Sequence, residues 1–145
     1  MTIERTLSVL RTQLQFELLQ AGAAVAESSN ACARIQRQVD ECRGRCDQLS
    51  HGLRDVLGDA KTNPEMMQVM HRMYRAESNV LRESERELAD AAARDEQLRA
   101  ELASLRNRER SLQQALQAQR SKQRARLQAK QIIIADDLWL QRRPA

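Results

Sequence analysis

The chain has 145 residues, of which 41% are hydrophobic, 30% are charged and only 2% are aromatic. This composition, with a mean hydropathy of -0.67, argues against a compact globular core of ordinary size and against an enzyme built around a deep pocket. A net charge of +4 is small for a general nucleic-acid-binding protein.

A long helix is predicted for the N-terminal part of the chain, from about residue 2 to 57. Apolar or small side chains recur there in alternating steps of three and four residues, the spacing of a coiled-coil seam. The seam positions are Leu18, Ala21, Val25, Ser28, Cys32, Ile35, Val39, Cys42, Cys46, Leu49, Leu53 and Val56. Toward the N-terminus we expect the seam to continue through Leu14, Leu10, Leu7 and Ile3, where two consecutive steps of four predict a stutter.

All three cysteines, Cys32, Cys42 and Cys46, lie on this predicted seam. A buried cysteine behaves as a small apolar side chain, and unpaired thiols are typical of a reducing compartment. We therefore expect them to fill the seam of a soluble, cytoplasmic protein.

The only strong break in the helical pattern falls between Gly58 and Pro64, close to the middle of the chain. A second helix is predicted from about residue 65 to 141, with a seam at the same average spacing of 3.5 residues. Its positions are Met67, Met70, Tyr74, Glu77, Leu81, Ser84, Leu88, Ala91, Asp95, Leu98, Leu102, Leu105, Glu109, Leu112 and Leu116.

The two helices predict an all-α fold, an antiparallel coiled-coil hairpin that forms a single domain over residues 1–145. Reversing the chain at the turn pairs seam positions such as Val56 with Met67. In that register Ser28 meets Asp95, a polar pair that would fix the alignment at some cost in stability. Small residues also face each other, 29–33 against 89–93.

The second helix is longer than the first, so its C-terminal part is left without a partner. In the predicted register Ile3 reaches Arg120, and residues 121–145 extend beyond the first helix. No acidic residue occurs between Glu109 and Asp136. The basic residues in that interval are Arg110, Arg120, Lys122, Arg124, Arg126 and Lys130.

An apolar cluster at residues 132–140 follows the basic stretch and includes Trp139, the only tryptophan. Tryptophan and arginine are favoured anchors of protein interfaces, so we expect this cluster to dock into another protein. The alternative is that it folds back over the first helix, covering Ile3, Leu7 or Phe16. Beside the turn, Met66, Met67, Met70 and Met73 predict a second contact surface, because methionine adapts to irregular partners.

Catalytic and metal-binding motifs are absent from the sequence. There is no GxSxG, HExxH or Walker A pattern, and the four glycines are scattered. His51 and His71 would lie near each other across the turn, but neither is on the seam, and no CxxC or HxxxH spacing supports a zinc site. No uncharged stretch is long enough to span a bilayer. We therefore expect no enzyme activity, cofactor, metal or integral membrane segment.

The midpoint turn, the longer second helix and the basic open end resemble the central-stalk proteins of flagellar and virulence-associated type III secretion ATPases. That family is similar to the coiled coil of the rotary ATPase gamma subunit. The resemblance implies a non-enzymatic stalk whose paired termini insert into the hexameric ATPase ring. The region near the turn would meet the cytoplasmic domain of the export gate at the inner membrane, and some members also bind export chaperones.

The resemblance assigns regions rather than aligned residues. The residues implied for the ATPase interface are Arg5, Arg11, Arg120, Lys122, Arg124, Arg126, Lys130, Ile133, Leu138, Trp139 and Arg142. Those implied for the export-gate or chaperone interface are His51, Arg54, Met66, Met70, Met73 and Tyr74.

Three other functions fit the same pattern. A generic cytosolic coiled-coil adaptor or chaperone would differ from a stalk only in its partner. The basic helix could bind nucleic acid, although glutamines dilute its charge and it lacks aromatic side chains for stacking. It could also lie on the surface of an anionic membrane.

Overall fold

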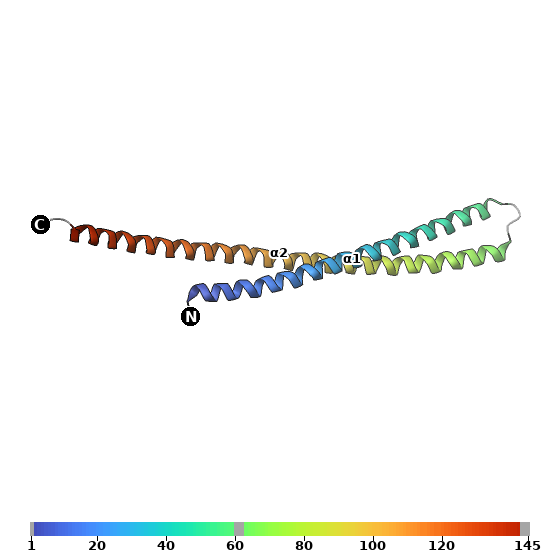
Figure 1. Ribbon diagram of the computed structural model, residues 1–145. Helices are drawn as coiled ribbons and strands as arrows, with labels where there is room; N and C mark the ends of the chain where they lie inside the picture. Colours follow the sequence, from blue (N-terminus) through green and yellow to red (C-terminus); the bar gives the residue numbers. More distant parts are fainter. Residues whose placement is uncertain (1, 60–62, 143–145) are drawn as a thin grey trace. The chain divides into compact units, whose positions relative to one another are not determined.

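The computed structural model describes residues 2–59 and 63–142 (Figure 1). They form two helices, α1 (Ile3–Leu57) and α2 (Pro64–Arg142), and the described residues include no strand. The predicted all-α fold of two long helices is confirmed. The sequence placed the helices at about 2–57 and 65–141.

Local hydrogen bonds mark the helix ends on both sides of the turn. The side-chain oxygen of Asn63 accepts a hydrogen bond of 3.1 Å from the backbone N–H of Glu65, which makes Asn63 the N-cap of α2. Pro64 takes the first helical position, where its missing N–H costs nothing. At the end of α1, the backbone N–H of Gly58 donates to the carbonyl of Arg54 at 3.0 Å. These local hydrogen bonds and Pro64 therefore define where α1 ends and where α2 begins.

The chain divides into two compact units, each containing one segment of α1 and one of α2. The turn unit comprises residues 21–101, and the terminal unit comprises residues 1–20 and 102–145. The single domain expected from the sequence stays a prediction.

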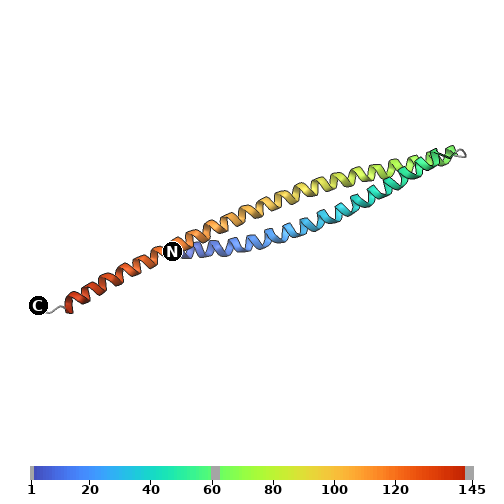
Figure 2. The ribbon, with the colours of Figure 1, turned by 90° about the horizontal axis from the view of Figure 1, so that it is seen from above.

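In the turn unit, α1 and α2 pack along the predicted seam (Figure 2). Val39 is fully buried, and Cys42 and Cys46 are buried beside it. All the other seam positions predicted in this unit are half-buried. Ser28 is one of the groups that lower the pKa of the Asp95 carboxyl, so the two residues lie near each other across the seam, as the predicted register pairs them.

Exposed ion pairs flank the seam of the turn unit. Arg43 lies 3.4 Å from Glu85, and Arg45 lies 3.3 Å from Glu77. Side chains in these pairs remain partly solvated, so each pair contributes little to stability. The apolar seam, rather than these charges, supplies most of the stabilisation.

In the terminal unit, Leu14 and Leu116 are buried, and the seam of α1 then departs from its predicted course. Arg11 and Glu4 are half-buried, whereas Leu10 is 47% exposed and Ile3 is 65% exposed. The predicted stutter is therefore wrong. Steps of three and four continue to alternate, because this spacing keeps one face of α1 toward α2. The aliphatic stem of arginine can cover apolar surface at such a position.

Beyond α1, the C-terminal part of α2 continues as an uninterrupted helix (Figures 1 and 2). Near the start of α1, the side-chain amide of Gln123 donates to Glu4 Oε2 at 3.2 Å. Residues 124–142, here called the overhang, are all exposed. The alternative in which the apolar cluster folds back is wrong, since the helix runs straight on and Phe16 is 62% exposed.

Candidate functional site

The basic side chains of the terminal unit lie largely in solvent. Of the basic residues predicted for the ATPase interface, only Arg11 is half-buried. The others are exposed: Arg5, Arg120, Lys122, Arg124, Arg126, Lys130 and Arg142. All three ion pairs found between described residues lie in the turn unit. The acid-free part of α2 consequently presents positive charge that no neighbouring carboxylate on its own helix neutralises.

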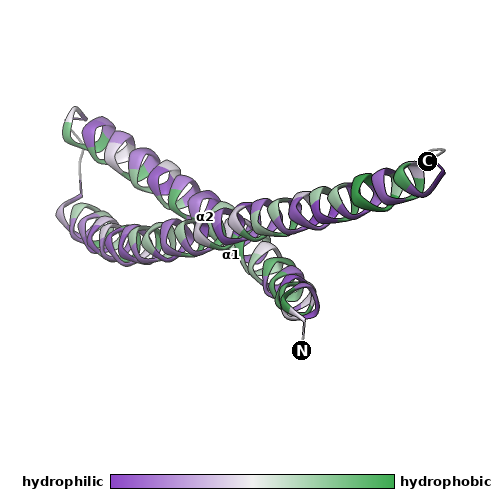
Figure 3. Cartoon of the chain, turned by 90° about the vertical axis from the view of Figure 1, so that its left-hand side faces the viewer, coloured by the Kyte–Doolittle hydropathy of each residue, from purple (hydrophilic) through white to green (hydrophobic). Residues whose placement is uncertain are grey.

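The overhang also carries apolar side chains that face water. Ile133, Leu138 and Trp139, predicted from the sequence, are at least 49% exposed. Figure 3 shows hydrophobic residues near the C-terminal end of α2, and they include Ile132, Ile134 and Leu140. Exposed apolar clusters with polar surroundings are typical of contact sites. Leu127 belongs to this surface as well but was missed, because a single leucine within a basic run is a weak signal.

Near the turn, the predicted residues divide between surface and seam. His51, Arg54, Met66 and Met73 are exposed, whereas Met70 and Tyr74 are half-buried. Met70 packs over Gly52, since its Cε atom lies 3.0 Å from the place that a Cβ on this glycine would occupy. The turn region therefore offers a smaller surface than the predicted set implied.

Three predicted arginines come together at one cavity in the terminal unit. Arg11 of α1 and Arg120 and Arg124 of α2 line a space of about 400 Å³. The remaining lining residues are Gln113, Leu116, Gln117 and Ser121. The sequence shows that Arg120 and Arg124 lie one helical turn apart, but only the corrected course of α1 brings Arg11 beside them.

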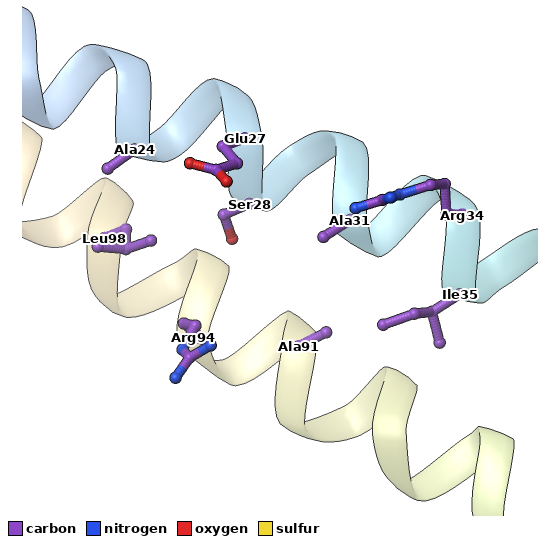
Figure 4. A pocket seen from close by; sticks show the side chains of 9 residues that line it. All are labelled: Ala24, Glu27, Ser28, Ala31, Arg34, Ile35, Ala91, Arg94 and Leu98. Carbon is purple, nitrogen blue, oxygen red and sulfur yellow. The ribbon is translucent and has the colours of Figure 1, made fainter.

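The turn unit has a gap of about 410 Å³ where small side chains meet (Figure 4). Ser28 and Ala31 point from α1 toward α2, and Ala91 points back toward α1. The expected facing of small residues is confirmed there. Close by, the Arg99 guanidinium at 2.8 Å, assisted by Ser28, holds the pKa of the Asp95 carboxyl below its usual range.

Two buried thiols of the turn unit, Cys42 and Cys46, lie in the seam. Burial, reinforced by the charge of Glu77, raises the pKa of the Cys46 thiol and keeps it protonated. Arg45 donates to Cys42 Sγ at 3.2 Å, and its hydrogen bond to Glu77 raises the pKa of Arg45. The Cys46 thiol is a packed seam residue rather than a reactive nucleophile.

The described residues offer neither a metal site nor a membrane span. No group of three or more histidine, cysteine or acidic side chains is gathered there in a way that could hold a metal ion. Neither helix, over its described length, contains a stretch apolar enough to cross a membrane.

Comparisons with protein-family models, with curated proteins and with solved structures find no match to this chain. The candidate site consequently rests on the geometry and charge of the terminal unit.

Proposed function

We propose that this chain is the non-enzymatic central stalk of a type III secretion or flagellar export ATPase. The single observation that carries the proposal is the exposed overhang, in which a basic stretch without acidic residues is followed by an apolar cluster that contains Trp139 and the acidic pair Asp136 and Asp137. In this role the terminal unit enters the hexameric ATPase ring. The exposed residues near the turn contact the cytoplasmic domain of the export gate, or an export chaperone.

The physical basis of the role is differential binding. A cationic, asymmetric helix contacts the subunits of a ring unequally and favours one conformational state in those that it binds best. Basic side chains accelerate the encounter and set its orientation, while the apolar end supplies buried area. The chain itself catalyses no reaction, and it works in the cytoplasm beside the inner membrane through the complex that it joins.

A truncation tests the proposal. Removing residues 132–145 deletes exposed apolar residues without touching the seam, so circular dichroism at 222 nm should still show two packed helices. Binding to the hexameric secretion ATPase and stimulation of ATP hydrolysis should both be lost. The matched control is the double variant Met66→Ala and Met73→Ala, which alters exposed apolar residues near the turn and should leave both activities intact. Unchanged ATPase binding by the truncated chain would refute the proposal.

A generic adaptor or chaperone remains the second candidate, because it shares every feature except the partner. It predicts that the chain binds secreted cargo or another helical protein and leaves ATP hydrolysis by the ATPase unaffected. Measuring that hydrolysis rate with the full chain therefore separates the two functions.

A further inference from the structure

The cavity between α1 and α2 in the terminal unit has features of an anion site. Its lining contains three guanidinium groups, from Arg11, Arg120 and Arg124, and no carboxylate. Its neutral lining residues include two glutamines and a serine, all of which can donate hydrogen bonds.

Arg11 supplies an independent observation. Its Nε atom is buried and has no hydrogen-bond partner among the described residues. A buried guanidinium N–H without a partner is costly, and such groups are commonly satisfied by a bound ion or water. Glu4, in the same unit, accepts a hydrogen bond from the neutral amide of Gln123.

We propose that this cavity binds a phosphate group. Arginine forks match phosphate oxygens in geometry, and hydrogen bonds between charged groups are about twice as strong as those between neutral ones. A space of about 400 Å³ has room for a diphosphate or a triphosphate. An anion in this cavity contacts both α1 and α2. It lies beside Arg11, the charged residue that takes a seam position.

The proposal is independent of the proposed function, because the chain can bind phosphate whether or not it joins an ATPase. The free ligand and a lipid headgroup share this chemistry, and the experiment distinguishes them. Inorganic pyrophosphate is titrated into the full chain by isothermal calorimetry at constant ionic strength. In a second arm, vesicles containing phosphatidate are sedimented with the full chain, with and without pyrophosphate.

The expected result is saturable binding of pyrophosphate at one site per chain. Losing one charge-assisted contact in Arg11→Gln or Arg120→Gln should weaken it about tenfold. Arg142→Gln removes an equal charge from the exposed overhang and should change the affinity less than twofold. Circular dichroism verifies that each variant is folded, and Arg120→Gln keeps the test valid if Arg11→Gln unfolds the terminal unit.

Vesicle binding that needs Arg11 and is displaced by pyrophosphate assigns a lipid headgroup as the source of the phosphate, whereas pyrophosphate binding without vesicle binding assigns a free ligand. Equal weakening in Arg142→Gln, or no binding beyond that of chloride, would overturn the site.

Discussion

At the scale of single residues, burial in this chain is concentrated in a few side chains. Val39, Cys42 and Cys46 are the buried residues of the turn unit, and Leu14 and Leu116 are those of the terminal unit. Two packed helices cover less apolar surface than a globular core does. Individual seam positions should therefore account for a large share of the free energy of unfolding.

Shortening the Val39 side chain tests whether single seam positions account for much of the free energy of unfolding. Val39→Ala removes two fully buried methyl groups and should lower the free energy of unfolding by about 2 kcal/mol. Val80 is 44% exposed in the same unit, so Val80→Ala should change it by less than about 0.5 kcal/mol. Urea unfolding followed by circular dichroism measures both. Equal effects would mean that the seam does not run through Val39.

The Asp95 carboxyl makes stability depend on pH. Its pKa is lower in the folded chain than in the unfolded one, because Arg99 and Ser28 favour the charged form. The Asp95 carboxylate therefore makes its full contribution to the free energy of unfolding above the ordinary carboxyl pKa. That contribution is lost as the pH falls through the pKa that Asp95 has in the folded chain. The free energy of unfolding should begin to drop as the pH falls below about 5 and should keep dropping through the folded pKa. Asp95→Asn should show a smaller drop over the same interval, and an identical pH profile in the variant would contradict this assignment.

At the scale of the helices, periodicity predicted most of the fold. Every seam position predicted in α2 is half-buried or buried, because the same spacing repeats without interruption over fifteen positions. Gly44 and Gly52 lie within α1 despite a cost of about 1 kcal/mol each relative to alanine. Only the first turns of α1 were misassigned. There an apolar residue stands immediately before a charged one, as Leu10 does before Arg11, and hydropathy alone selects the wrong member of the pair.

A pair of leucine variants tests the corrected seam. Leu14 is buried against α2, so Leu14→Ala should lower the free energy of unfolding by about 2 to 3 kcal/mol. Leu10 is largely exposed one turn away, and Leu10→Ala should lower it by less than about 1 kcal/mol. Thermal melts of the full chain compare the two. A larger loss of stability in Leu10→Ala than in Leu14→Ala would show that the seam follows the predicted stutter after all.

At the scale of the whole molecule, the sequence predicted the unpaired end of α2 but could not predict the arginine-lined cavity. The overhang follows from helix lengths and the position of the turn, both of which are visible in the chain. The cavity depends on which face of α1 packs, and on how the side chains around Arg11 fill the space. The interface residues themselves stay predictions, because exposure identifies available surface and does not identify the partner.

Amide hydrogen exchange, followed by mass spectrometry with and without the hexameric secretion ATPase, tests the central claim most directly. The stalk function predicts that the ATPase slows exchange at residues 2–11 and 120–142 and leaves residues 51–59 and 63–74 unchanged. Protection confined to the region near the turn, or no protection anywhere, would contradict it.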